Sequence, residues 1–432
     1  MNKKKNLFLI LLKGGSESLF FKLSGALASL ILQLFLTRNL SSNDYGMYVY
    51  LLAWVNSFVM ISILGIDKFI IKNLSSSIYK IYEKKENLIA WSIKKLSLSI
   101  LLCSIILAII LYLNNINSFY ILASLFLFTV FSIRRVQSAI AQAYKYMSLA
   151  FATEFIRKML LLIALSILIY YSYNIDLNVK HILITEVLIS SVVILVFLYY
   201  TFHYSNINIK INLVFNNIKS KEWNKASLLF FWVASVHVVL NQSDIIMLGM
   251  LESPKKSGYY NIVYLISNTL GLILMAVNAI LAPIISEAYT SNDIKKLGKA
   301  VRYASLISFF VVMPVAVLFM IYREFIISLF GSEYLVASEA LNILLFSQIF
   351  ISAINTGSII LSMTEYVSLT AKIISLSAIL NIILNVVLIP LYGITGAAIS
   401  YAICTIFWNL SLGYYSYNHL NISPVFFIKS NI

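Results

Sequence analysis

The chain returns again and again to apolar stretches of about 20 residues, and this feature restricts its fold more than any other. A helix needs roughly 20 apolar residues to cross the hydrocarbon core of a bilayer. The content of 60% hydrophobic and 11% charged residues also exceeds that of soluble globular chains. We therefore expect an all-α integral membrane protein with about twelve transmembrane helices. The expected spans are approximately 13–36, 45–66, 93–113, 118–142, 156–173, 181–202, 226–249, 259–284, 302–321, 338–360, 367–389 and 394–416.

The basic residues set the expected orientation. The chain has a formal net charge of +15, and most of its 32 Lys and Arg fall in connections that share one side of the membrane. Cytoplasmic connections carry such an excess of Lys and Arg. We therefore expect both termini in the cytoplasm, and the positive charge does not indicate a nucleic-acid partner.

A short polar turn recurs in the two halves of the chain. Placing Gly46 on Gly258 also places Tyr48 on Tyr260, and each copy lies between the first and second span of its half. An even number of spans per half gives both halves the same orientation, as in transporters built from parallel repeats. We expect two six-helix lobes with pseudo-twofold symmetry, residues 1–222 and 223–432, with a cleft between them.

Polar residues inside apolar spans are the candidate functional residues, because an unpaired charge in hydrocarbon is costly. In the first span Lys22, Gly25, Ser29 and Gln33 follow at steps of three or four and share one helical face with Ser18. Gly and Ser also serve close helix packing. Lys22 lies too deep for packing alone, so we interpret this face as lining an aqueous cavity.

Arg134 and Arg135 lie about nine residues from the cytoplasmic end of the fourth span, a depth of about 13 Å. One interpretation pairs an arginine with an acid such as Asp67 or Asp244. The other places a guanidinium in a water-filled cavity, where its planar donors suit phosphate oxygens.

In the seventh span His237, Asn241 and Asp244 share one face. An intramembrane carboxylate is a candidate site for H⁺ or Na⁺, and we assign this role to Asp244. The alternative is a structural ion pair between the lobes. His237 alone is more typical of packing or hydrogen bonding.

Amides form further stripes, which include Asn268 in the eighth span and Gln348 in the tenth. Such groups suit sugar hydroxyls, and they equally suit hydrogen bonds between helices. Asn381 and Asn385 precede Pro390, which we expect to end its helix, so we assign these two to architecture.

The sequence does not indicate an enzyme. It has four scattered histidines, no His/Cys spacing typical of a metal site and no phosphate-binding loop of the G-x-x-x-x-G-K type. Cys103 and Cys404 lie inside spans, where thiols serve as small hydrophobes. We expect no cofactor, apart from a coupling ion.

Several motifs together resemble polysaccharide-exporting flippases of the multidrug/oligosaccharidyl-lipid/polysaccharide superfamily, which include the O-antigen flippases. The resemblance covers nearly the whole chain, although each motif is short. The motifs are Thr37 to Gly46, Gly65 to Lys68, Ser243 to Gly249, Gly258 to Tyr260, Ala282 to Ile285, Leu329 to Tyr334, Asn381 to Asn385 and Leu388 to Ala398.

This resemblance implies two helical bundles in a V, as in MATE transporters, around a cationic cavity. The implied activity moves an undecaprenyl-pyrophosphate-linked oligosaccharide from the cytoplasmic to the periplasmic leaflet of the bacterial inner membrane. Candidate partners are membrane lipids, a polysaccharide polymerase and a chain-length regulator. The implied pyrophosphate ligands are Lys22, Arg134 and Arg135, and the implied polar lining is Gln33, His237, Asn241, Asn268 and Gln348.

Two other functions remain open. Drug or cation antiporters of the MATE type belong to the same superfamily. A membrane-embedded glycan polymerase or ligase would handle the same lipid-linked sugars, but such enzymes carry a large external catalytic loop that this pattern of spans does not provide. Lipid II flippases carry two more helices, which disfavours transport of a peptidoglycan precursor.

Overall fold

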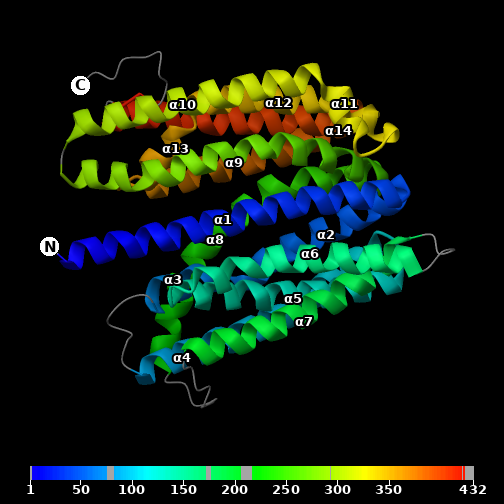
Figure 1. Cartoon of the computed structure of the whole chain (residues 1–432), viewed down its shortest axis with the longest axis horizontal. Helices are drawn as coiled ribbons and strands as arrows, with labels where there is room; N and C mark the ends of the chain where they lie inside the picture. Colours follow the sequence, from blue (N-terminus) through cyan, green and yellow to red (C-terminus); the bar gives the residue numbers. More distant parts are fainter. Residues whose placement is uncertain are drawn as a thin grey trace. The chain divides into compact units, whose positions relative to one another are not determined.

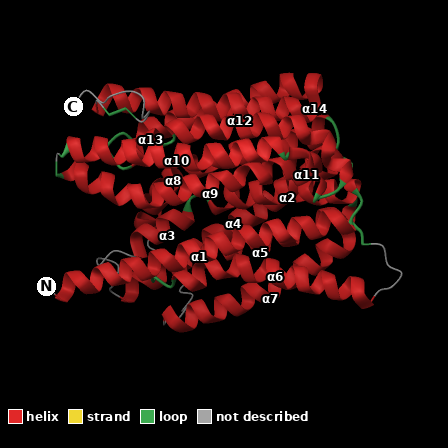
Figure 2. Cartoon of the chain, turned by 45° about the horizontal axis from the view of Figure 1, so that its top comes forward, coloured by secondary structure: helices red, strands yellow, loops and turns green. Residues whose placement is uncertain are grey.

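The computed structural model describes residues 2–74, 82–171, 177–205, 217–291, 293–420 and 422–423, which are almost entirely helical (Figure 1). Figure 2 draws helices and loops in this described part, and no strand. Nine helices among these residues are long and apolar enough to cross a membrane. The expectation of an all-α, multi-pass membrane protein is thereby confirmed.

Every expected span overlaps a helix of the structure. One of the nine apolar helices, α14, holds the last two expected spans. The expected spans 156–173 and 226–249 fall in α6 and α8, which are outside the nine. Glu154, Arg157 and Lys158 near the start of α6 make that helix unusually charged for a transmembrane segment.

The chain forms two compact units. Unit 1 comprises Met1–Asp44 and Leu51–Val238, and unit 2 comprises Tyr45–Tyr50 and Val239–Ile432. The lobe boundary expected at residue 222 stays a prediction. Two helices, α2 and α8, contribute residues to both units.

In unit 1, α1 packs along α6, and α5 packs against α3, α6 and α7. The turn between α2 and α3 places Leu64 and Gly65 in left-handed conformations, and Asn117 caps α5 by accepting a hydrogen bond from the backbone N–H of Phe119. The helices are α1 (Asn2–Asn39), α2 (Ser42–Ile63), α3 (Ile66–Leu74), α4 (Tyr82–Leu113), α5 (Ser118–Ala143), α6 (Met147–Tyr171), α7 (Val179–Ser205) and α8 (Asn217–Leu251).

In unit 2, α10 packs between α9 and α12, and α14 packs on α12 and α13. The expectation that Pro390 ends its helix is wrong. The helix continues through Pro390 and is interrupted at Gly393, whose φ of 55° and ψ of −127° are readily adopted only by glycine. The elements are α9 (Pro254–Thr290), α10 (Ile294–Ile321), α11 (Arg323–Ser328), the 3₁₀ helix η2 (Ser332–Ala337), α12 (Ser338–Ile354), α13 (Thr356–Ser362) and α14 (Val367–Leu420).

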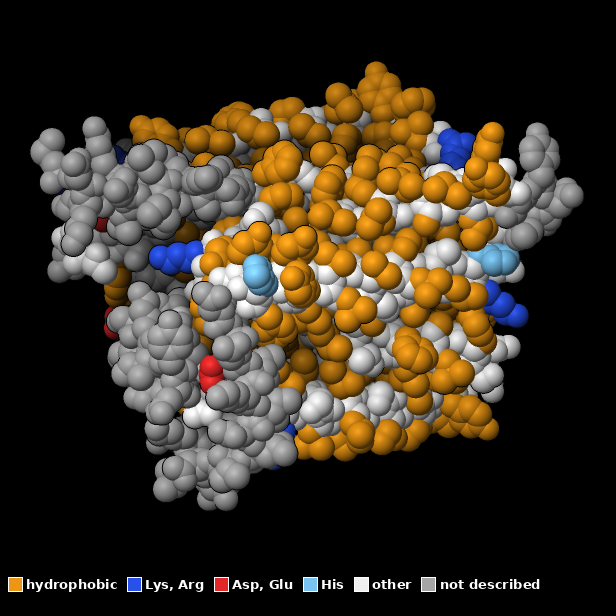
Figure 3. Space-filling model, turned by 60° about the horizontal axis from the view of Figure 1, so that its bottom comes forward, with side chains coloured by type: hydrophobic (Ala, Val, Ile, Leu, Met, Phe, Trp, Pro, Cys, Tyr) orange, Lys and Arg blue, Asp and Glu red, His pale blue; other side chains and the backbone are white. Residues whose placement is uncertain are grey.

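Large hydrophobic side chains are exposed along the helices. On α4 the exposed set includes Leu98, Leu101, Leu102, Ile105 and Ile109, which recur at steps that define one helical face. The molecular face drawn in Figure 3 is covered largely by such side chains. Soluble proteins rarely expose continuous apolar surface of this extent, so these faces are suited to contact with lipid.

Unit 2 contains a close approach between the start of α2 and the start of α9. A Cβ atom added to Gly46 would lie 2.3 Å from the backbone oxygen of Pro254, and one added to Gly258 would lie 2.8 Å from Cα of Gly46. The two glycines that align in the sequence repeat therefore lie against each other. Side chains larger than hydrogen do not fit at this contact.

We predict that Gly46→Ala destabilises the protein by about 1–3 kcal/mol, because the added methyl group meets backbone atoms that have no room to move. The thermal unfolding midpoint of the detergent-solubilised protein measures this effect. Gly25→Ala is the matched control, since a Cβ at Gly25 meets nothing within 4 Å. Equal midpoints for the two variants would contradict the prediction.

Candidate functional site

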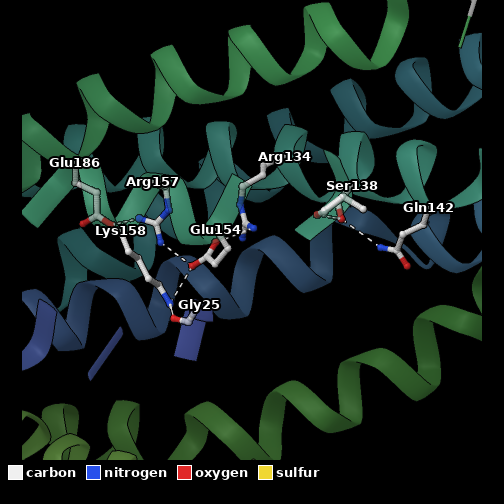
Figure 4. A network of polar contacts seen from close by, with 9 residues as sticks. Gly25, Arg134, Ser138, Gln142, Glu154, Arg157, Lys158 and Glu186 are labelled. Atoms are coloured by element: carbon white, nitrogen blue, oxygen red, sulfur yellow. Dashed lines mark hydrogen bonds and ion pairs between the residues drawn. The ribbon is translucent and has the colours of Figure 1, made fainter. Parts of the chain in front are cut away.

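A network of charged side chains joins α5, α6 and α7 in unit 1 (Figure 4). Glu154 lies at its centre. Its Oε2 is 2.7 Å from Nη1 of Arg134, and its Oε1 is 2.8 Å from Nη2 of Arg157 and 3.2 Å from Nζ of Lys158. Arg157 also donates to Glu186 of α7. One carboxylate thus faces three cations.

Helical spacing and burial explain this arrangement. Arg157 and Lys158 follow Glu154 by three and four residues on α6, so both lie beside Glu154 on the helix surface. The Glu186 side chain is only 1% exposed, and a buried carboxylate is tolerated when a cation and hydrogen bonds balance it. The guanidinium of Arg157 also lies 4.8 Å from the ring centroid of Phe131, a cation–π contact.

Arg134 and Arg135 point to different acids. Arg134 pairs with Glu154, a partner that was not expected from the sequence. Nε of Arg135 lies 3.4 Å from Oδ2 of Asp67 on α3. Asp67 is one of the two partners that the sequence left open. Each of the two arginines therefore has a carboxylate beside it.

Lys22 is exposed on α1, the helix that packs along α6. Its Nζ is 4.9 Å from the ring centroid of Phe151, which lies three residues before Glu154 on α6. Three residues after Lys22, the carbonyl of Gly25 accepts a hydrogen bond of 3.5 Å from Lys158. Lys22 is thus brought to the same side of the bundle as the charged network, and no ion pair to it is found in the described ranges.

Asp244 belongs to a second polar cluster, inside unit 2. Its side chain is buried, and it accepts hydrogen bonds from Tyr260 at 2.9 Å, Asn381 at 3.1 Å and Asn385 at 2.6 Å. Ser243 donates to Asn381 at 2.6 Å. These partners are all neutral, and within the part of the chain that the structure describes Asp244 forms no ion pair. The role of Asn381 and Asn385 is therefore more specific than the architecture expected from the sequence.

The other predicted lining residues differ in exposure. Asn241 is exposed and accepts a hydrogen bond from Tyr264 at 3.1 Å, while Asn268 is exposed on α9 and Gln348 is buried in α12. Gln33 is half-buried on α1 in unit 1. The side chain of His237 lies outside the described residues. Roles in substrate contact for all five stay predictions.

The structure adds Glu154, Arg157, Lys158, Glu186 and Tyr260 to the candidate residues. Glu186 was detectable, because it is an acid inside the expected span 181–202. Arg157 and Lys158 fall at the start of the expected span 156–173, where basic residues are typical of the cytoplasmic side. Their convergence with Glu186 and Arg134 depends on helix packing, which spacing within one helix does not reveal.

The clusters differ in the ligands that they suit. In the described residues no group of three or more His, Cys, Asp or Glu is arranged to hold a metal ion. The oxygens of Asp244 and of Asn385, whose buried Oδ1 has no hydrogen-bond partner, suit a proton or a hard monovalent cation. The cations of unit 1 suit an anionic group.

Two family models match the chain. The model described as "polysaccharide biosynthesis protein" matches residues 11–289, more than half of the chain. The model described as "MatE" matches residues 233–387.

Two curated relatives match a part of the chain. An uncharacterised membrane protein of Methanocaldococcus jannaschii is 34% identical over 143 residues, which are 33% of this chain and 28% of the relative. A probable low-salt glycan biosynthesis flippase of Haloferax volcanii is 27% identical over 161 residues, which are 37% of this chain and 34% of the relative. The chain thus matches about a third of the length of these relatives.

Solved structures share the fold over most of the chain. An inward-facing multidrug-resistance MATE transporter matches with a TM-score of 0.67 and 14% identity, over 90% of this chain and 98% of that one. The lipid II flippase MurJ in an inward closed conformation matches with a TM-score of 0.65 and 17% identity, over 92% and 87%. At this identity the likeness shows the fold alone.

We predict that Glu186→Gln destabilises the protein by about 3 kcal/mol, because it removes the charge of a carboxylate that balances the buried Arg157. The unfolding midpoint in detergent measures this effect. The matched control is Glu287→Gln, which breaks an ion pair with Lys296. The Glu287 side chain is 72% exposed, so we expect this substitution to destabilise the protein by less than about 1 kcal/mol. Similar midpoints for both variants would refute the prediction.

Proposed function

The chain belongs to the family of polysaccharide biosynthesis proteins, and from that premise we propose that it is a flippase for a polyprenyl-diphosphate-linked oligosaccharide. In the proposed cycle, alternating access carries the diphosphate and the sugars between leaflets while the polyprenyl chain stays in the bilayer. The proposed cargo is an undecaprenyl-linked O-antigen or capsular repeat unit, and the proposed location is a bacterial inner membrane.

The observation that supports this proposal most directly is the cationic group of unit 1. This group consists of Lys22, Arg134 and Lys158, which belong to α1, α5 and α6. Arg134 and Lys158 pair with Glu154, and Lys22 lies over the ring of Phe151 on the same helix as Glu154. An excess of cations is costly in hydrocarbon, and an anionic headgroup that passes between leaflets would offset this cost. Phosphate oxygens are suitable acceptors for guanidinium and ammonium groups.

The Asp244 cluster supports coupling of transport to an ion. A carboxylate surrounded by neutral donors lacks a charge partner, so a proton or Na⁺ bound there would neutralise it. Binding or release of that ion changes the net charge of a buried site by one unit. Such a change is a means of biasing one conformation over another.

A second candidate function is a drug or cation antiporter, which the match of residues 233–387 to the MatE model favours. That match covers Asp244, Tyr260 and both asparagines of the cluster, and it leaves out the charged network of unit 1. An antiporter of cations has no need for the cationic group, and for this reason we prefer the flippase.

The function is tested by deleting the gene in its host and locating lipid-linked oligosaccharide. We expect loss of surface glycan, with single repeat units retained on the cytoplasmic leaflet. Repeat units that reach the outer leaflet unpolymerised would indicate a polymerase instead. Normal glycan with altered tolerance of drugs or cations would support the antiporter.

We predict that Asp244→Asn folds and abolishes the dependence of transport on a proton or sodium gradient, because the amide no longer gains or loses charge. Flux of labelled lipid-linked oligosaccharide in proteoliposomes, with and without each gradient, measures this effect. Asp293→Asn is the control, since Asp293 caps α10 and Asn caps helices equally well. Unchanged gradient dependence in Asp244→Asn would remove this residue from the mechanism.

We predict that Arg135→Lys retains part of the flux and Arg135→Ala little, because lysine keeps the charge but loses the planar pair of donors. Lys22→Gln should also lower the flux, because it removes a positive charge that would attract the diphosphate. The control is Arg302→Ala, at an exposed position of α10. Full flux in a variant with alanine at both Arg134 and Arg135 would contradict a role for these arginines in binding diphosphate.

A further inference from the structure

The cations around Glu154 differ in how they are balanced. Arg157 contacts two carboxylates, those of Glu154 and Glu186. Arg134 and Lys158 form ion pairs with Glu154 alone among the residues that the structure describes. Arg134 also has a buried Nε without a hydrogen-bond partner. The donors of Arg134 are therefore only partly used.

The two carboxylates of the network also differ in access. The Glu154 side chain is 30% exposed, whereas that of Glu186 is 1% exposed. Arg134 is 22% and Lys158 17% exposed, so together with Glu154 they form the more accessible end of the network, whereas Glu186 contacts Arg157 at the opposite end (Figure 4). Lys22 lies near the accessible end, over Phe151. A solute that reaches the network from outside the bundle would meet the Glu154 end.

The charges at the accessible end do not balance. Arg134 and Lys158 are two cations that pair with one carboxylate, Lys22 is a third cation over the neighbouring ring of Phe151, and the remaining cation of the network, Arg157, is balanced by Glu186. A diphosphate diester carries two negative charges and several acceptor oxygens, so it matches these cations better than a single carboxylate does. A carboxylate nevertheless offers anionic oxygen acceptors to the same guanidinium and ammonium donors.

We propose, resting on the flippase function, that Glu154 is an internal counter-ion that the diphosphate of the cargo displaces from Arg134 and Lys158. Glu154 keeps its contact with Arg157 during this exchange, so its charge stays balanced. Without cargo, Glu154 holds the two cations in place and lowers the cost of their burial. When Glu154 pairs with them again, it competes with the diphosphate and favours release. Glu154 is thus a positioning residue that sets the affinity for the cargo.

The binding test uses inorganic diphosphate as the probe, titrated calorimetrically into the purified protein in phosphatidylcholine nanodiscs at fixed ionic strength. We expect Glu154→Gln to bind it about tenfold more tightly than the unmodified protein, because the competing charge is gone. Glu287→Gln makes the same change in net charge at an exposed position of unit 2, and we expect no change in its affinity. Three results would overturn the proposal. They are unchanged or weaker binding by Glu154→Gln, an equal gain in affinity in Glu287→Gln, and no binding by any of the three proteins.

Two further measurements test the same exchange independently of Glu154→Gln. If Glu154→Gln does not fold, Glu154→Asp withdraws the carboxylate by one methylene, and we expect about threefold tighter binding. Unchanged affinity in this variant, or loss of folding in both, would overturn the proposal. Phosphatidylglycerol added to the nanodiscs tests whether the site binds membrane phospholipid instead of the cargo. If phosphatidylglycerol displaces the diphosphate probe, the site belongs to phospholipid and the proposal fails.

Flux measurements separate a positioning role from a structural one. We expect Glu154→Gln to lower both KM and kcat for the lipid-linked oligosaccharide, because the cargo binds more tightly and leaves more slowly. A purely structural role would lower kcat without lowering KM, which would count against the proposal. If the unmodified protein binds diphosphate but moves no oligosaccharide, the flippase function fails while the competition at Glu154 stands on the binding data.

Discussion

A charge within a membrane must be paired or hydrated, and this constraint organises the polar residues of both units. The two units meet it differently. Unit 1 places opposite charges together, with Glu154 and Glu186 among the cations of α5 and α6. Unit 2 surrounds Asp244 with neutral donors, which leave its charge without a partner in the described residues. An excess of positive charge therefore remains in the network of unit 1, and a single negative charge remains in the Asp244 cluster of unit 2, which is why the two clusters suit ligands of opposite sign.

Most of the fold was predictable, because the length of an apolar stretch depends on bilayer thickness and is visible in the sequence. The positions of breaks within helices were less predictable. Pro390 is the stronger breaker by propensity, yet the interruption falls at Gly393. Proline lacks one donor and fixes φ near its helical value, whereas the φ of 55° and ψ of −127° at the interruption suit a residue without a Cβ, and the glycine three positions later meets that requirement.

The candidate site was predictable only in part. Lys22, Arg134, Arg135 and Asp244 stood out because each breaks the apolar rule of its span. The residues that pair with them could not be recognised in the same way. The pairing of Arg134 with Glu154 depends on the register between α5 and α6, and the contacts of Asp244 with Asn381 and Asn385 join residues 137 and 141 positions apart. A helical face read from one span shows which side is polar but does not show what that side meets.

The boundaries between the two units fall inside helices. Tyr50 and Leu51 are consecutive residues of α2, and Val238 and Val239 are consecutive residues of α8, yet each pair is divided between the units. A helix is a stiff rod that bends gently unless a proline, a glycine or a lost hydrogen bond allows a kink. Neither boundary has a proline or glycine within three residues, the nearest being Gly46 in α2, four residues before Tyr50. Both helices therefore continue from one unit into the other without a residue type that favours a sharp bend, so the chain is divided between the units without any loop at these two points.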